Sequence, residues 1–283
     1  MALRDTIRKL TAQHLDAGYS VMGQTLTAVG FVGNTVPDHP RITELPCSDV
    51  SNAGVAVGHA LAGKRPIYII RYQGFSWLNA APIVNYAAKS KAMWGKPCPM
   101  LIRGIAMEGS IGPVAGSSHH ALWDAPGMKI YSPMTSEEWT TAYQEFMAGD
   151  DPVYLSEHRG AWGEDIGEKT LHRTAPDCVL FPISITRSAA FDAAVQCNCS
   201  VFPIWRLRPL ETSVAALEAL RRCGRGLVID DAHTPYAKAV AHDLASLTGA
   251  RMKVLGLDDR TAGFYRDNLP PTAARIIQCL NAH

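Results

Sequence analysis

The sequence predicts an α/β protein that contains two doubly wound parallel sheets. Short apolar runs alternate with helix-length segments in the first half of the chain, and one of these runs, Ile67–Ile70, is continuously apolar. The same alternation begins again after a glycine-bearing interruption at 159–178. Strands that alternate with helices are typical of parallel sheets whose two faces are both covered.

The first half is predicted to begin with an amphipathic helix over 1–15, because its apolar positions recur with helical spacing. Strands are expected at 19–22, 42–45, 67–70, 100–103 and 153–155, and helices at 53–62, 76–88 and 136–149. Gly54 and Gly58 indicate that the helix over 53–62 packs closely against neighbours. Ser136 is the expected N-cap of the helix over 136–149, ahead of two glutamates that suit its first turn, and Gly149 is expected to terminate it.

The interruption at 159–178 is interpreted as a linker, since Gly160, Gly163 and Gly167 stand there among mixed charges. The predicted organisation is therefore a first domain over 1–158 and a second over 179–283. Within the second, strands are expected at 179–181, 201–205, 227–229 and 252–255, and helices at 189–195, 213–222, 236–247 and 272–281. Pro270 and Pro271 are expected to set the entry of the last helix.

Composition excludes several classes of protein. Lys plus Arg total 27 against 26 Asp plus Glu, so no strong field exists to attract nucleic acid. No segment reaches the ~20 consecutive apolar residues that span a bilayer, and the charged N-terminus does not resemble a signal peptide. A cytoplasmic protein with no membrane partner is predicted. Seven cysteines are expected to remain thiols there, and Cys197 and Cys199 lack the second ligand pair of a zinc site.

Common self-contained active sites are missing from the sequence. It contains no P-loop, no G-x-G-x-x-G turn, no G-x-S-x-G elbow and no H-E-x-x-H helix. This absence favours either a site that another polypeptide completes or a binding module, and the pattern alone leaves both open.

The segment Leu45–Gly63 resembles, without gaps, the pyrimidine-binding segment of β subunits of thiamine-diphosphate-dependent 2-oxo acid dehydrogenases. Pyruvate, branched-chain and acetoin dehydrogenases and the wider transketolase-like superfamily share this segment. Further similar blocks follow in the same order: Ile83–Lys89, Pro126–Pro133, Asp151–Leu155, Trp205–Glu211 and Asp267–Pro270. The resemblance implies a transketolase-like pyrimidine-binding domain followed by a transketolase C-terminal-like α/β domain.

The resemblance also implies a function that needs a second chain. Such a β subunit shares thiamine diphosphate with an α-type subunit, which holds the diphosphate and Mg²⁺ through a G-D-G motif followed by asparagine. Here Gly149-Asp150-Asp151 and Gly163-Glu164-Asp165 both lack the second glycine, so no metal site is expected on this chain. The expected assembly has two α and two β chains, with a lipoyl-bearing core as a further partner. The expected reaction is decarboxylation of a 2-oxo acid with transfer of the acyl or aldehyde unit.

Two alternatives stay open at this point. One is a specialised subunit of a split transketolase or carboligase, and the other is a non-catalytic scaffold. The role of Asp49 distinguishes a catalytic subunit from a scaffold. Asp49 occupies the position of the family glutamate that hydrogen-bonds a ring nitrogen of the cofactor's pyrimidine. Aspartate is one methylene shorter than glutamate. Its other interpretation is a cap of the following helix, which Ser48 or Ser51 would serve equally.

Five further residues are candidates for the site. Phe75 matches the family's aromatic that stacks on the pyrimidine, against the alternative of core packing, and Tyr72 and Gln73 are weaker candidates beside it. His119 and His120 fall where the family has a substrate-contacting histidine, although Pro126 follows sooner here than in the family. His119 is preferred, and a solvated loop is the alternative for either histidine.

Overall fold

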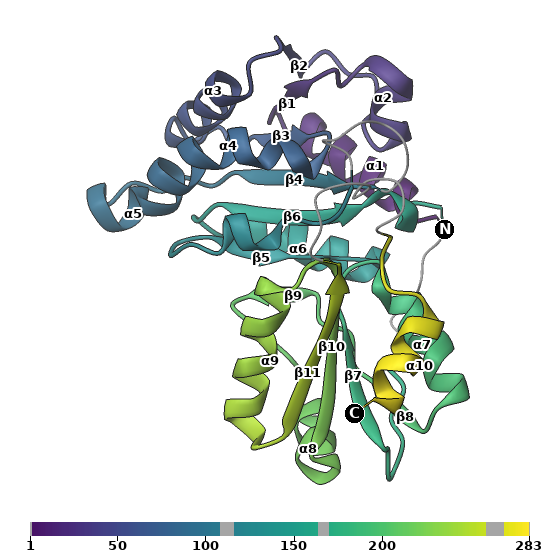
Figure 1. The fold of residues 1–283 in the computed structure, drawn as a ribbon. Helices are drawn as coiled ribbons and strands as arrows, with labels where there is room; N and C mark the ends of the chain where they lie inside the picture. The colour runs from purple at the N-terminus through teal and green to yellow at the C-terminus, as the bar shows by residue number, and fades with distance from the viewer. Residues whose placement is uncertain (1, 108–115, 164–169, 259–268, 283) are drawn as a thin grey trace.

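The computed structural model describes residues 2–107, 116–163, 170–258 and 269–282. Its strands form a seven-stranded sheet in the order β2-β1-β3-β4-β6-β5-β9 and a four-stranded sheet in the order β11-β10-β7-β8 (Figure 1). Among the described strands every pairing is parallel except that of β5 with β9. The predicted α/β class with parallel sheets is confirmed.

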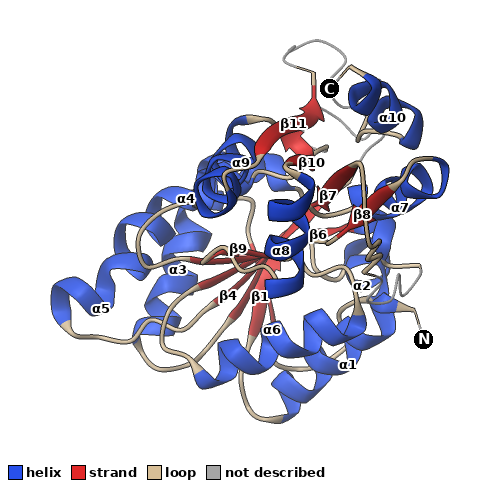
Figure 2. Cartoon of the chain, turned by 90° about the horizontal axis from the view of Figure 1, so that it is seen from below, coloured by secondary structure: helices blue, strands red, loops and turns tan. Residues whose placement is uncertain are grey.

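The first sheet contains β1 (Val21–Gln24), β2 (Ile42–Leu45), β3 (Ile67–Ile70), β4 (Leu101–Ala106), β5 (Lys129–Tyr131) and β6 (Val153–His158). Helices α3 (Asp49–Leu61), α4 (Ser76–Pro82) and α5 (Ala88–Trp94) lie on one face, whereas α1 (Leu3–Asp16) and α6 (Ser136–Ala148) lie on the other (Figures 1 and 2). The short α2 (Ala28–Asn34) packs with the α1 side. Two separate apolar cores, one on each face, hold these layers together.

The helical segment predicted over 76–88 extends to Trp94 and is interrupted by a π-turn. Pro82 ends α4, the turn Ile83–Ala87 is a π-helix, and α5 continues to Trp94. Proline inside a helix removes a hydrogen-bond donor, and a π-turn absorbs the resulting offset. Helix α6 also differs from expectation, because Thr135 is its N-cap and accepts a hydrogen bond from the Glu138 amide. The Glu138 side chain reaches back to the amide of Met134, which completes the cap.

The second sheet contains β7 (Cys178–Pro182), β8 (Cys199–Val201), β10 (Arg225–His233) and β11 (Arg251–Leu257), with helices α7 (Thr186–Gln196), α8 (Val214–Cys223), α9 (Pro235–Thr248) and α10 (Ala273–Asn281). Ser213 caps α8 through its hydroxyl. The N-cap of α10 is Thr272, so Pro270 and Pro271 precede the helix and do not occupy its first turn as expected. Asp267 and Asn268, like Glu164, Asp165 and Gly167, lie outside the described residues.

One short strand connects the two sheets. Strand β9 (Arg206–Arg208) follows β8 in the chain but pairs antiparallel with β5 at the edge of the first sheet. Arg206 forms ion pairs with Glu145 and Glu211, and Arg208 pairs with Asp124. The apolar core on the α3 side continues from the first sheet to α8 and α9, which pack on the second. No described helix is long and apolar enough to cross a membrane.

A buried ion pair links the two central strands β4 and β6. The guanidinium of Arg103 donates to Glu157 at 2.9 and 3.2 Å and to the Thr35 hydroxyl at 2.9 Å, and both charged side chains are 1% exposed. The Trp162 indole also donates to Glu157. Burial raises the pKa of Glu157, although Arg103 opposes this shift.

Arg103→Met is expected to lower the free energy of unfolding by about 3–5 kcal/mol, because it leaves a buried carboxylate without its cation. Urea denaturation of the purified chain measures the change. Arg251→Met, at an exposed position on β11, is the control and should change stability by less than about 0.5 kcal/mol. Equal midpoints for the two variants would show that the Arg103–Glu157 pair is not needed for the fold.

Candidate active site

Asp49 is the first residue of α3 and is held by a side chain of α4. Asn79 donates a hydrogen bond of 2.7 Å to Asp49 Oδ1, and the Tyr68 hydroxyl donates to Asn79 Oδ1 at 2.5 Å. Ser48 occupies the N-cap position without a side-chain cap bond, so Asp49 does not cap α3. Asn79 is fully buried whereas Asp49 is only half-buried. The network therefore fixes the direction of a carboxylate that stays partly open to solvent.

Phe75 lies in the short 3₁₀ turn Gln73–Phe75 between β3 and α4. Its backbone carbonyl accepts a second hydrogen bond from Asn79, at 2.9 Å, which ties this turn to Asp49. The ring packs partly on the core and is tilted against Tyr72, with 6.2 Å between the ring centroids. Both rings are half-buried, so each keeps some surface for contact outside the chain. Phe75 therefore packs on the core and keeps part of its ring exposed.

His119 approaches the same segment from a distant part of the chain. Its backbone amide donates to Gln73 Oε1 at 2.7 Å, and its ring lies edge-on to the Trp77 ring with 6.4 Å between centroids. Ring atom Nδ1 donates to the Ser117 carbonyl at 2.9 Å, which leaves Nε2 as the lone-pair atom of a neutral ring. Burial lowers the pKa of His119, although the Ser117 carbonyl opposes this shift. A neutral imidazole at pH 7 follows.

Phe75 and His119 are partly exposed, whereas the Gln73 and His120 side chains are fully buried, each 0% exposed. The Gln73 amide donates to the Gly104 carbonyl at 3.1 Å and to Ser156 Oγ at 2.8 Å, so its donors are used within the chain. The His120 ring faces Asp230, with 3.3 Å between Nε2 and Oδ1. Neither side chain has surface with which to touch a ligand, unlike the expectation from sequence. Gln73 instead supports His119.

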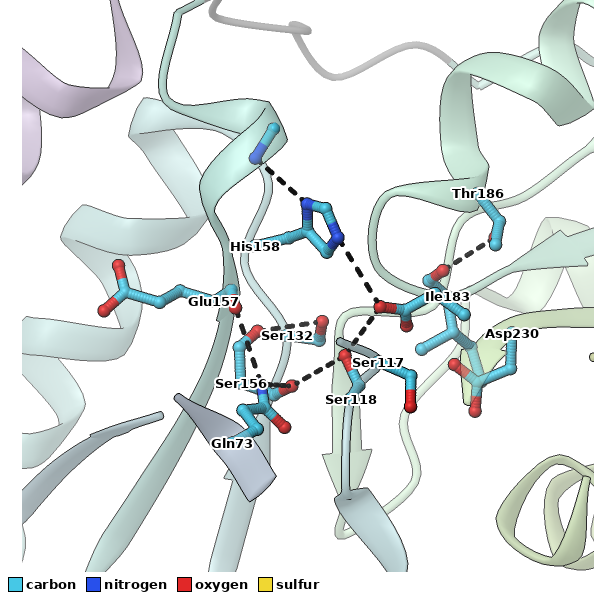
Figure 3. Close-up of polar contacts among 12 residues, drawn as sticks. Gln73, Ser117, Ser118, Ser132, Ser156, Glu157, His158, Ile183, Thr186 and Asp230 are labelled. Atoms are coloured by element: carbon cyan, nitrogen blue, oxygen red, sulfur yellow. Dashed lines mark hydrogen bonds and ion pairs between the residues drawn. The ribbon is translucent and has the colours of Figure 1, made fainter. Parts of the chain in front are cut away.

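A buried polar cluster that includes Ser118 and His158 lies between the two sheets (Figure 3). Ser118 Oγ donates to Asp231 Oδ2 at 2.8 Å, and His158 Nε2 lies 3.9 Å from the same oxygen. Burial and the neighbouring Asp230 raise the pKa of Asp231 to about 6. No motif in the sequence pointed to these residues or to Asn79. One available signal was that Asp230 and Asp231 directly follow the buried strand at 227–229, where the carboxyl ends of parallel strands carry functional groups.

The helices on the α3 side of the first sheet expose many large apolar side chains. Eight of the twelve large apolar side chains exposed among the described residues fall between Val50 and Trp94. We call this surface the α3–α5 apolar face, and its members are Val50, Val55, Leu61, Trp77, Leu78, Tyr86, Met93 and Trp94. Trp77 is 67% exposed although its ring touches His119. Exposed aromatic residues and methionine gathered in one region are typical of a protein interface.

The fold and this site define an α/β protein whose candidate functional residues open onto an apolar surface. Residues 5–164, more than half of the chain, match the model of the transketolase pyrimidine-binding domain. The chain belongs to this family, as the segment Leu45–Gly63 predicted.

Curated relatives agree with this assignment. The chain is 26% identical over 216 residues to the pyruvate dehydrogenase E1 component subunit beta of Rickettsia felis, a match that covers 68% of this chain and 64% of the relative. Identity is also 26% to the acetoin:2,6-dichlorophenolindophenol oxidoreductase subunit beta of Cupriavidus necator, over 68% of this chain and 62% of the relative. The chain thus spans somewhat less than two thirds of the length of these β subunits.

Solved structures share the whole fold. A split-gene transketolase, described as an inactive β4 tetramer, aligns over 100% of this chain and 97% of its own, with a TM-score of 0.78 at 17% identity. Transketolase from Campylobacter jejuni aligns over 100% of this chain and 47% of its own, with a TM-score of 0.74 at 12% identity. At these identities the likeness shows a common fold.

Proposed function

We propose that this chain is the β-type subunit of a heteromeric thiamine-diphosphate-dependent enzyme that decarboxylates a 2-oxo acid and transfers the resulting acyl or aldehyde unit. The observation that carries the proposal is the Asp49–Asn79–Phe75 arrangement beside the α3–α5 apolar face, within a transketolase pyrimidine-binding domain. A carboxyl group and an aromatic face are the two features that an aminopyrimidine ring needs for a hydrogen bond and for stacking.

The residues present fit this cofactor. When bound, thiamine diphosphate supplies the nucleophilic carbon that adds to the carbonyl of the donor substrate. In this proposal Asp49 hydrogen-bonds the pyrimidine ring through Oδ2, because Asn79 binds Oδ1. Asn79 and Tyr68 hold the carboxylate in one orientation. Phe75 excludes water from one face of the ring.

Within this proposal, His119 accepts and returns a proton at Nε2. Its Nδ1–H is committed to the Ser117 carbonyl, and its position beside Trp77 places it at the border of the apolar face. A neutral ring is required for such an acceptor, and the lowered pKa provides one.

His119→Asn is expected to lower kcat about 100-fold while cofactor affinity stays within a factor of about three, because asparagine can keep the bond to Ser117 but lacks Nε2. Steady-state kinetics of the reconstituted complex and calorimetric cofactor titration measure the two quantities. His172→Asn, far along the chain in an exposed position, is the control. An unchanged kcat in His119→Asn would remove His119 from the proton-transfer role.

The partner in this proposal is an α-type chain that carries the diphosphate and Mg²⁺ ligands, in an assembly of two α and two β chains. The α3–α5 apolar face is the surface proposed to meet it, because it contains the exposed aromatics and adjoins Asp49. Co-expression with a chain that carries G-D-G followed by asparagine tests the function. Turnover of 2-oxo acids with an artificial electron acceptor is expected only from the pair, and a stable pair without turnover of any 2-oxo acid or ketose would contradict it.

A split transketolase or carboligase is the second candidate. It is supported by the fold, since a split-gene transketolase chain aligns over 100% of this chain and 97% of its own length. The two candidates differ in the acceptor. Product analysis of the reconstituted pair distinguishes them: carbon dioxide release from a 2-oxo acid with reduction of an electron acceptor favours the dehydrogenase class, whereas transfer of a two-carbon unit to an aldose favours the transketolase class.

A further inference from the structure

Three titratable side chains converge at a fully buried point between the two sheets. His120 comes from the loop after β4, and Asp230 and Asp231 come from the carboxyl end of β10. The distance from His120 Nε2 is 3.3 Å to Asp230 Oδ1 and 3.9 Å to Asp231 Oδ1. All three side chains are 0% exposed, and their three ligand atoms lie within 4.8 Å of one another.

Several polar atoms of this cluster lack a hydrogen-bond partner although they are buried. Asp231 Oδ1, Asp230 Oδ2 and His120 Nδ1 have none among the described residues. Asp231 Oδ2, in contrast, accepts from Ser118 and faces His158. Because one oxygen of Asp231 is occupied by donors, its other oxygen is left directed at His120 and Asp230. A buried carboxylate oxygen without a hydrogen-bond partner is costly, so Asp231 Oδ1, which lies beside the hydrogen-bonded His120–Asp230 pair, indicates a missing ligand.

The backbone of β10 explains how two consecutive residues reach one point. Successive side chains of a regular strand alternate between faces. In β10 the register to β11 shifts between Ile229 and His233, the segment that contains both aspartates. Such irregularities redirect side chains and occur beside functional sites.

We propose that this cluster binds one divalent transition-metal ion of the zinc class, with His120 Nε2, Asp230 Oδ1 and Asp231 Oδ1 as its ligands. Ligand atoms around a tetrahedral zinc ion lie about 3.4 Å apart, close to the separations here. A divalent ion would balance the charge of the two buried carboxylates. The imidazole ligand favours zinc or iron over Mg²⁺, which prefers oxygen ligands alone.

Ser118 and His158 act as positioning residues in this site. The Ser118 hydroxyl donates to Asp231 Oδ2, and His158 Nδ1 accepts from the Gly160 amide, so its hydrogen is on Nε2, facing Asp231. Donors of this kind orient a metal-binding carboxylate. The ion would tie the loop that carries His119 to the second sheet. The importance of this link for His119 rests on the proposed function, whereas binding of the metal ion does not.

Cobalt(II) titration of the full chain, purified with a chelator and free of thiamine diphosphate, tests the proposal. One Co²⁺ per chain is expected, with visible absorption that Zn²⁺ abolishes and Mg²⁺ does not. Asp231→Asn should weaken Co²⁺ binding by about 100-fold or more, and Ser118→Ala by about 10-fold. The double variant His242→Gln, Asp243→Asn changes an exposed adjacent His–Asp pair on α9 and should bind as the wild type does.

The wild-type chain alone can overturn the proposal. A folded wild type that gives no visible cobalt absorption and no rise in its thermal midpoint with Co²⁺ or Zn²⁺ contradicts it, whether or not Asp231→Asn folds. Equal Co²⁺ affinity of wild type and Asp231→Asn contradicts it as well. Loss of catalytic function in the assembled enzyme has no bearing on either result, so failure here is distinguishable from failure of the proposed function.

Discussion

Asp49→Ala is expected to lower kcat/KM of the reconstituted enzyme by about 100- to 10,000-fold, the range that loss of one acid–base group typically produces. The variant removes the carboxyl group that is proposed to bind the pyrimidine ring, and Asn79 loses an acceptor at 2.7 Å. Asp49→Asn separates these two effects, because its amide oxygen can still accept from Asn79. A similar loss in both variants is expected, measured as initial rates on complexes whose assembly is verified by size.

The control for these variants is Asp5→Ala. Asp5 is an exposed acidic residue in the first turn of α1, so it has the same favourable position relative to a helix dipole as Asp49 in α3. Its removal should leave kcat/KM unchanged. Wild-type turnover in both Asp49 variants would favour a scaffold subunit over a catalytic one.

Gly58→Arg is expected to weaken binding to the α-type partner about 1000-fold, equivalent to about 4 kcal/mol. Val50, Gly54, Gly58 and Leu61 are spaced at three and four residues and lie on the exposed side of α3. A Cβ atom at Gly54 or Gly58 would meet nothing within 4 Å in the isolated chain. A larger side chain at position 58 is therefore tolerated within this chain. It is expected to clash only with a partner that packs against α3.

Fluorescence anisotropy of a labelled partner, titrated with this chain, measures the effect of Gly58→Arg. Its thermal midpoint should not fall, since replacing a helical glycine removes an entropic cost of about 0.5–1 kcal/mol. Val195→Arg on α7, at a position that is 79% exposed, is the matched control and should bind normally. Normal partner binding by Gly58→Arg would show that α3 is not at the interface.

Most of the fold was predictable because local patterns and tertiary structure agree. Strands at 42–45 and 67–70 have the predicted bounds, and the alternation of strands and helices gave the parallel sheets. The segment over 76–94 departs because Pro82 forces a π-turn that apolar spacing does not reveal. Strand β9 was missed, since its three residues are stabilised by pairing with distant β5 and by ion pairs to Glu145 and Asp124.

The candidate site was only partly predictable. Hydrogen bonds of Asn79 connect Asp49 with Phe75, and Gln73, in the same turn as Phe75, binds the His119 amide, whereas the Gln73 and His120 side chains are fully buried. The motif does not distinguish the adjacent residues His119 and His120. The backbone conformation there directs the His119 ring toward Trp77 and the His120 ring toward Asp230. The role of Asn79 depends on a contact between α4 and α3 that spans thirty positions, which no local pattern encodes.

The division of one cofactor between two chains is the central claim, and thiamine diphosphate binding tests it most directly. Calorimetric titration with Mg²⁺ present compares this chain alone, the α-type partner alone and the assembled pair. Saturable binding by the pair at least about 100-fold tighter than by either chain is the expected result, with the gain lost when the pair contains Asp49→Ala. Equally tight binding by this chain alone would contradict the claim, because it would place the diphosphate and metal ligands on this polypeptide.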